Sequence, residues 1–230
     1  GSRCGPFPDA INAFGLVIQH YPDTPLSMDS YLKIGESYTR MNQLESAEAT
    51  LQALIDVTDK ADIKDEANYR IGWIHVDLAS WEEARSYFGN ISEGNRERYR
   101  LKRLLVELGK EEMIVRKNPR LAGFLSILPG GGYAYLGRYQ DAATAFLLNT
   151  GLIVAAATAF KDDNPALGGV ISFVGSGFYF GNIFGAVSST HKYNKDQTGR
   201  FIDRLKANTR INLLADRQYR GVILALQVAF

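Results

Sequence analysis

Two long apolar runs lie next to each other in the second half of the chain. Residues 142–160 and residues 166–189 contain no Asp, Glu, Lys or Arg, and only the charged, Pro-containing segment 161–165 separates them. A helix needs about 20 predominantly apolar residues to cross the hydrocarbon core of a bilayer. Both runs approach or exceed that length, so the sequence predicts a transmembrane helical hairpin whose tip is the short charged link.

Charge is divided unevenly along the chain. The net charge is only +1, but residues 1–95 contain 7 Lys and Arg against 15 Asp and Glu, whereas residues 96–230 contain 19 against 10. A basic segment beside long apolar runs is typical of contact with an anionic lipid surface. We therefore expect an acidic half in water and a basic half at a lipid bilayer, with no nucleic-acid partner.

The first part of the chain repeats with a period of 37 residues. The anchors of this repeat are Ala10, Ala47 and Ala84, the large residues Phe14, Leu51 and Phe88, and the glycines Gly35 and Gly72. Between the anchors, apolar residues follow the spacing of amphipathic helices. One helical pair cannot bury its own apolar face, so stacked neighbours are expected to share a core in a helical solenoid.

This pattern resembles the tetratricopeptide repeat. The second copy supplies that family's ordered set of aromatic, apolar-Gly, aromatic, small and bulky residues: Tyr31, Ile34, Gly35, Tyr38, Ala47, Leu51 and Leu54. The third copy departs from the set at two aromatic positions, which Asn68 and His75 occupy, and the first copy begins with its second helix. The resemblance implies an all-α repeat domain over residues 1–95 with a truncated first repeat, similar to bacterial envelope assembly lipoproteins.

The same resemblance implies that a protein or peptide partner binds along the concave face of the first helices. By register, that face includes Leu32, Glu36, Tyr69, Trp73 and Val76. For Tyr69 and Trp73, packing inside the repeats is the alternative interpretation. Both interpretations stay open at this point.

A basic connector follows over residues 96–120. Its apolar stripe at helical spacing consists of Leu101, Leu104, Leu105 and Leu108. This amphipathic helix could lie on an anionic leaflet or cap the last repeat, and both interpretations can hold together. Pro119 is expected to stop or kink it.

The predicted membrane domain spans residues 121–190 and opens with a glycine-rich turn. Three tyrosines and an arginine follow the glycines: Tyr133, Tyr135, Arg138 and Tyr139. Tyr is enriched where hydrocarbon meets headgroups, so 121–139 is predicted to be a re-entrant segment. Residues 117–139 resemble the opening of small bacterial domains in which a Pro-Gly-x-Gly-x-x-Tyr-Leu-Gly-Arg turn precedes a helical hairpin. The resemblance implies topology only, and it rests on Pro129, Gly130, Gly132, Tyr135, Leu136, Gly137 and Arg138.

Small residues recur every four positions in both apolar runs. They are Gly151, Ala155 and Ala159 in the first run and Gly177, Gly181 and Gly185 in the second. Within lipid, close backbone contact through small residues drives helix association. These faces are expected to pack on each other or on a second copy of the chain, which would give a homo-oligomer. The runs hold no ionisable residue, and this argues against a transport pathway.

The tail over residues 191–230 has two predicted parts. Residues 197–214 have the pattern of a second basic amphipathic helix. Residues 222–230 alternate with period two and end at Phe230, which predicts a short β-strand. A terminal Phe resembles the closing strand of outer-membrane barrels, but a barrel needs at least about eight strands. A small strand packed on its own domain or on a partner is therefore favoured.

The sequence indicates no catalytic, cofactor or metal site. The three histidines are scattered, Cys4 is the only cysteine, and no nucleophile lies beside a base. We expect a non-catalytic, membrane-anchored scaffold or assembly factor in a bacterial cell envelope, in the inner membrane rather than the outer. The alternative is a small oligomerising membrane-domain protein with regulatory repeats. The basic flanks of the hairpin predict cytoplasmic repeats by the positive-inside rule, whereas the lipoprotein resemblance implies periplasmic ones.

Overall fold

A computed structural model describes residues 7–209 of the chain, and within that range it contains helices and no strand. The all-α prediction is confirmed for this part, while the predicted strand over 222–230 lies outside the described residues. The described chain forms two compact units, residues 7–112 with 202–209 and residues 113–201.

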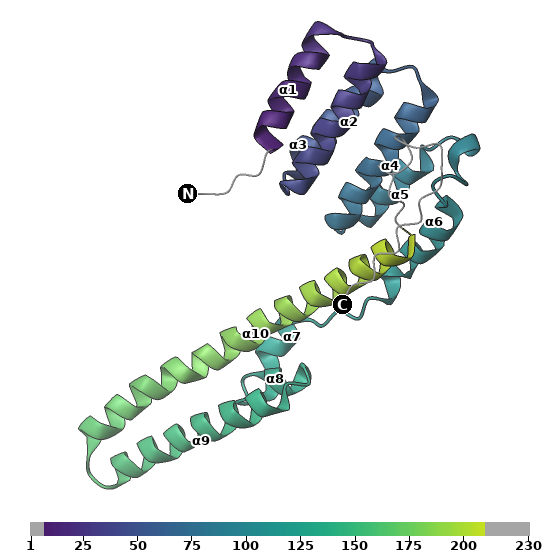
Figure 1. Cartoon of the computed structure of the whole chain (residues 1–230). Helices are drawn as coiled ribbons and strands as arrows, with labels where there is room; N and C mark the ends of the chain where they lie inside the picture. The colour runs from purple at the N-terminus through teal and green to yellow at the C-terminus, as the bar shows by residue number, and fades with distance from the viewer. Residues whose placement is uncertain (1–6, 210–230) are drawn as a thin grey trace, which may run out of the picture. The chain divides into compact units, whose positions relative to one another are not determined.

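The first unit is built from helical pairs. Its helices are α1 (Phe7–His20), α2 (Pro25–Arg40), α3 (Leu44–Val57), α4 (Ala61–Asp77) and α5 (Trp81–Gly89), shown in Figure 1. The Thr24 side chain accepts a hydrogen bond from the Ser27 N–H at 3.2 Å, and Pro25 begins the helix that follows. Asn42 and Ala79, one period apart, both have left-handed backbones, with φ values of 58° and 56°. The sequence period is therefore also a period of turn geometry.

Anchors of the second repeat copy lie in the core of this unit, whereas Ala10 and Phe14 of the first copy are only partly buried. The main buried cluster consists of Met28, Leu32, Ala47, Leu51, Leu54, Ala67, Ile71 and Ile74. Side chains from α2, α3 and α4 thus share one apolar interior, as expected for stacked pairs that cannot each bury their own face. The Arg70 guanidinium also donates to the Leu32 carbonyl at 3.0 Å, which ties α4 to α2.

The first unit ends in η1 (Glu93–Asn95), α6 (Leu101–Gly109) and η2 (Lys110–Met113). Three leucines of the predicted apolar stripe, Leu101, Leu104 and Leu108, are buried in α6, whereas Leu105 is exposed. The buried stripe packs inside the repeat unit, so the capping interpretation describes this structure. Residues 202–209 of the last helix also belong to this unit, where Lys206 forms an ion pair with Asp77.

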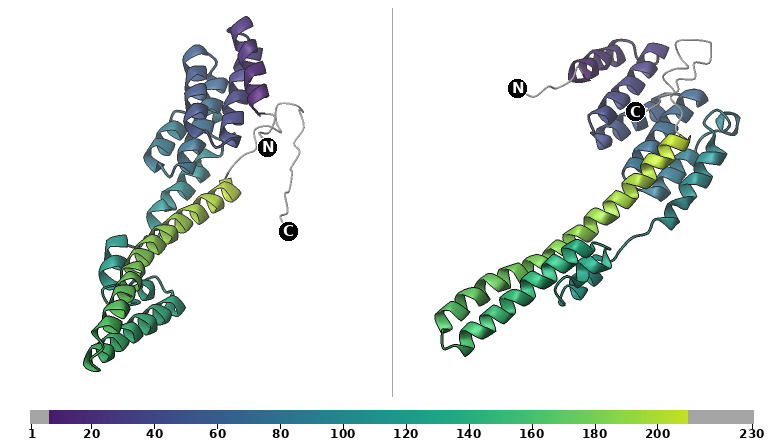
Figure 2. Two further views of the ribbon diagram at one scale, coloured as in Figure 1. Left: turned by 90° about the vertical axis from the view of Figure 1, so that its left-hand side faces the viewer. Right: turned by 60° about the horizontal axis from the view of Figure 1, so that its bottom comes forward.

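The second unit contains α7 (Pro119–Leu125), α8 (Gly131–Tyr135), α9 (Tyr139–Lys161) and α10 (Pro165–Thr209) as far as residue 201. The two long helices lie side by side as a hairpin in every view (Figure 2). The sequence predicts the second apolar run, 166–189, and the tail helix, 197–214, as separate segments, but within the described residues both lie in one helix, α10. No Pro or Gly stands between 189 and 197 to end it. The predicted end of the tail helix, 210–214, lies outside the described residues.

Candidate interaction surfaces

The residues predicted for the concave face occupy two different environments. Leu32, Tyr69, Trp73 and Val76 are buried, between 0% and 3% exposed, and only Glu36 is partly exposed. The Tyr69 ring stacks on Tyr99, with centroids 4.7 Å apart, and the Trp73 ring meets Phe88 edge to face at 6.0 Å. In this structure Tyr69 and Trp73 are packing residues, and a partner role for them stays a prediction.

The departure from the repeat pattern at His75 has a structural explanation. The His75 ring stacks on Tyr87 at 5.2 Å, and its Nε2 lies 3.0 Å from a carboxylate oxygen of Glu48. The Tyr87 hydroxyl donates to the same oxygen at 3.5 Å. Burial, and then the negative charge of Glu48, raise the pKa of the Tyr87 hydroxyl. A polar contact between α3, α4 and α5 thus stands where the family pattern has an aromatic residue.

The hairpin exposes its apolar side chains. Phe173, Phe184 and Leu147 are between 69% and 81% exposed. Along the apolar part of each long helix only 11% of the residues are buried. A helix hydrophobic on all sides is ordinarily buried in a protein core or in a membrane. Both helices are long and apolar enough to cross a membrane, and the second unit itself does not cover them.

The predicted small-residue stripes do not face each other within the hairpin. Gly151, Ala155, Gly177 and Gly181 are exposed, Gly185 is half-buried and Ala159 is buried. Other glycines make the contact between the helices, since Gly168 lies against Phe160 and Gly175 against Leu152. Gly185 instead lies under the Tyr133 hydroxyl. The hairpin therefore leaves most of the predicted stripes open.

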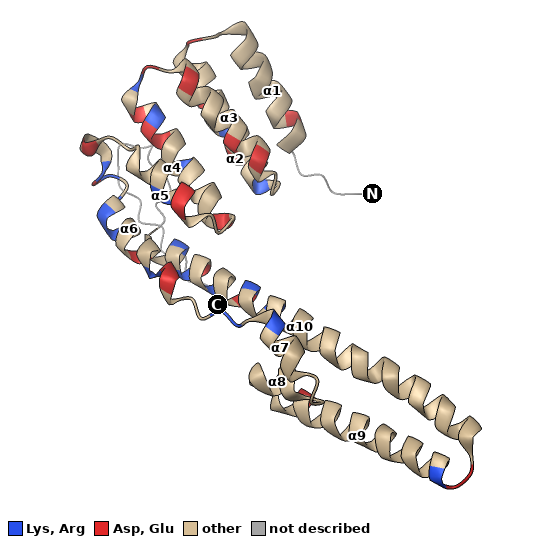
Figure 3. Ribbon diagram, turned by 180° about the vertical axis from the view of Figure 1, so that it is seen from behind, with Lys and Arg blue, Asp and Glu red and all other residues tan. Residues whose placement is uncertain are grey.

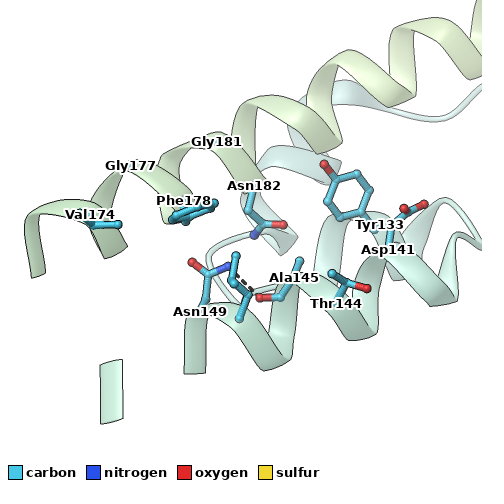
Figure 4. A pocket seen from close by; sticks show the side chains of 11 residues that line it. Tyr133, Asp141, Thr144, Ala145, Asn149, Val174, Gly177, Phe178, Gly181 and Asn182 are labelled. Atoms are coloured by element: carbon cyan, nitrogen blue, oxygen red, sulfur yellow. Dashed lines mark hydrogen bonds between the residues drawn. The ribbon is translucent and has the colours of Figure 1, made fainter. Parts of the chain in front are cut away.

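A cavity of about 460 Å³ lies between α8, α9 and α10 (Figure 4). Two buried amides line it. The Asn149 amide donates to the Ala145 carbonyl at 2.7 Å, and the Asn182 amide donates to the Ser126 carbonyl at 3.4 Å. The Asn182 Oδ1 has no hydrogen-bond partner among the described residues. Each amide therefore donates one hydrogen bond to a backbone carbonyl within the unit.

The residues of the glycine-rich turn hold the base of the hairpin together. Arg138 donates to the Ser189 hydroxyl at 2.8 Å, pairs with Asp141 at 2.6 Å and lies over the Tyr133 ring. The Lys117 backbone N–H and carbonyl both bond to the Asn194 side chain at 2.8 Å. The turn thus ties α9 to α10, while Asn194 of α10 holds the segment before α7. Figure 3 shows the long apolar stretches of the hairpin without charged residues.

No group of three or more His, Cys, Asp or Glu residues that could hold a metal ion occurs within residues 7–209.

Comparison with known proteins identifies one part of the chain. A family model for the tetratricopeptide repeat matches residues 29–57, which make up most of α2 and all of α3. No curated protein and no solved structure shows a significant match. The chain therefore contains a tetratricopeptide repeat, a helical unit whose stacked arrays form protein-binding surfaces.

Proposed function

We propose that the protein is a non-catalytic scaffold whose repeats hold a protein partner and whose hairpin α9–α10 anchors it in a membrane. The exposure of the hairpin is the observation that carries the anchoring. Burying one large apolar side chain is worth about 1.5–3 kcal/mol, and this hairpin presents many of them. Hydrocarbon would solvate these side chains, while the helices satisfy their own backbone groups.

The charges at the two ends of the hairpin support an orientation. The cations at its base are Arg116, Lys117, Arg120, Arg138, Lys192 and Lys195, whereas the tip carries Lys161, Asp162 and Asp163. The positive-inside rule would place the base in the cytoplasm of an inner membrane. Residues 1–112 precede the base directly, so the repeats would lie on the same side. We favour this arrangement in a bacterial envelope over the periplasmic one, because the charges belong to this hairpin itself.

Fractionation and labelling of the full-length protein test the anchor. It should stay in the membrane pellet after alkaline carbonate extraction. In a Cys4→Ser background, Asp163→Cys should react with an impermeant maleimide in intact cells, whereas Arg116→Cys should react only after lysis. Recovery as a soluble monomer without detergent would refute the anchor, and the reverse labelling pattern would refute the orientation.

Photo-cross-linking tests the scaffold role. A photoreactive residue at Glu36, on the first helix of its repeat, should form adducts with another protein. The matched control is Glu45, an exposed position on the second helix of the same repeat. Equal adducts at both positions, or none at Glu36, would contradict partner binding by the face that contains Glu36.

One observation favours a second role for the hairpin. Gly177 and Gly181 line the cavity described above and are exposed, and a Cβ atom on either would meet no atom within 4 Å beyond the local helix backbone. A second copy could approach closely along this stripe. Under that alternative, Gly181→Leu should abolish oligomers seen by cross-linking in membranes. Under the scaffold proposal, the same variant should keep the adducts at Glu36.

A further inference from the structure

A groove of about 890 Å³ lies between the end of α5, the segment after η1 and α6, all within the first unit. The side chains of Phe88 and Leu101 lie at its base and are almost fully buried. Two apolar side chains of α6 line it at the surface, Leu105 and Val106, and Val106 is 62% exposed. These two side chains form the apolar floor of the groove, which large side chains of a partner could cover.

Cations surround this floor. The groove is lined by Arg96, Arg100, Lys102 and Arg103, and by one carboxylate, Glu97. Within residues 7–209, neither Arg100 nor Lys102 nor Arg103 has an ion-pair partner in the structure. Figure 3 shows Lys and Arg on α6, in a unit whose other helices carry many Asp and Glu residues.

Five other cations of the first unit are held by carboxylates. The pairs are Arg40 with Glu36, Arg70 with Glu66, Arg85 with Glu82 and Glu111, Lys110 with Glu107 and Lys206 with Asp77. Residues 1–95 carry an excess of Asp and Glu, so the surface around these pairs would repel an acidic ligand. Within residues 7–209, Lys33, Lys60 and Lys64 also stand outside these pairs, but Arg100, Lys102 and Arg103 line one groove together. An acidic ligand would be attracted to that groove.

We propose that this groove binds an acidic amphipathic segment of the protein partner. Carboxylates of that segment pair with Arg100, Lys102 and Arg103, and its large apolar side chains cover Leu105 and Val106. The inference rests on the proposed scaffold role and names the chemistry of the partner. Charge complementarity sets the acidic character, and the apolar floor sets the need for large side chains.

An anionic membrane surface would supply the same negative charge, but α6 is poorly suited to it. A helix that lies on a bilayer inserts its apolar face into the headgroup region. The apolar face of α6, with Leu101, Leu104 and Leu108, is buried inside the repeat unit. The outward face of α6 lines the groove, and a peptide segment can bind in that groove.

Peptide binding to the full-length protein in neutral detergent tests the proposal. The probe is a fluorescein-labelled peptide in which Glu-Glu pairs alternate with Leu and Phe (the Glu peptide). The control peptide has Gln in place of every Glu (the Gln peptide). Binding is followed by fluorescence anisotropy at low and high salt. The Glu peptide should bind more tightly than the Gln peptide, and salt should weaken it. The double variant Lys102→Gln, Arg103→Gln should weaken binding of the Glu peptide by about tenfold.

A matched double variant controls for net charge. Arg40→Gln with Lys60→Gln removes two exposed cations of the same unit outside the groove, and it should change the affinity less than about twofold. Val106→Ser should weaken binding without changing its salt dependence, and circular dichroism checks that every variant stays folded. Equal binding of both peptides, or equal loss in both double variants, would overturn the proposal.

A second experiment tests lipid as the ligand. Micelles containing phosphatidylglycerol should bind the wild type and the Lys102→Gln, Arg103→Gln variant equally well. If the double variant loses binding to these micelles but not to the Glu peptide, the groove contacts a membrane surface and the peptide assignment is overturned. The scaffold role is judged independently by the adducts at Glu36. A protein that keeps those adducts but ignores the Glu peptide would lose the groove proposal alone.

Discussion

The ring of Phe88 packs directly over the backbone of Gly72. A Cβ atom added to Gly72 would lie 2.5 Å from the nearest ring carbon. One period earlier, Gly35 faces Leu51 in the same way, at 2.9 Å. The repeat of 37 residues read from the sequence is thus also a repeat of one close contact between paired helices.

Gly72→Ala should destabilise the repeat unit because the added methyl group must displace a fully buried ring. Overpacking of this kind costs about 1–3 kcal/mol, and the higher helix propensity of Ala returns up to about 1 kcal/mol. We expect a net loss of about 1–2 kcal/mol in urea unfolding followed by Trp fluorescence. Gly15→Ala is the control: a Cβ there meets nothing within 4 Å, so that variant should be as stable as the wild type or more stable. Equal stability of the two variants would contradict the close contact at Gly72.

Glu48→Ala should lower stability although its side chain lies partly at the surface. The substitution leaves the His75 Nε2 and the Tyr87 hydroxyl without the carboxylate that both contact. Loss of such a shared partner costs about 1–2 kcal/mol. Thermal unfolding would show it as a lower midpoint, compared with Glu45→Ala, an exposed glutamate in the same helix. If the two variants unfold at the same temperature, the polar contact does not stabilise the unit.

Tyr99→Phe should have little effect on stability at neutral pH, or increase it slightly. The Tyr99 hydroxyl is buried and has no hydrogen-bond partner within the described chain, and leaving such a group unsatisfied is costly. The variant keeps the ring that stacks on Tyr69. Chemical unfolding at neutral pH measures the difference, and a large loss of stability would show that the hydroxyl makes a stabilising bond.

Alkaline pH provides a separate test of the same residue. Burial is the main cause that raises the Tyr99 pKa from 10.0 to about 12. The folded state therefore favours the neutral hydroxyl, and the resulting stability is fully present below pH 10 and is lost as pH rises to about 12. The wild type should lose stability more steeply than Tyr99→Phe across this window, as measured by urea unfolding at stepped pH. Parallel curves would show that burial does not perturb Tyr99.

The sequence was sufficient to predict the elements whose cause is local. The period of 37 located the helical pairs, and the charge-free runs located both arms of the hairpin. It did not predict that α10 passes through both the second run and the tail as one helix. The composition between 189 and 197 changes from apolar to charged, but nothing in it breaks a helix. Solvent preference and helix propensity are separate properties, and only the former changes there.

The orientation of side chains within the packed units could not be predicted, because it depends on distant partners. Helical register correctly places Tyr69 and Trp73 on one face of α4, but Tyr99, far along the chain, covers that face. In the hairpin, the spacing of Gly177 and Gly181 is real, yet the helices meet through Gly168 and Gly175 instead. The third glycine of that spacing, Gly185, lies against Tyr133 of the short α8 rather than against α9.

Gly132→Ala should disrupt the turn that joins the base of the hairpin. An added Cβ would lie 2.1 Å from the Ser126 hydroxyl, 2.5 Å from the Ala122 carbonyl oxygen and 2.6 Å from the Ala186 Cβ. Backbone and Cβ atoms on two other helices cannot move aside as a flexible side chain can, so the cost should reach about 3 kcal/mol. Size-exclusion chromatography after heating in detergent should give a clearly lower melting temperature. Gly151→Ala, where nothing lies within 4 Å, should melt with the wild type. If Gly132→Ala also melts at the wild-type temperature, α8 does not pack against α7 and α10 as it does in this structure.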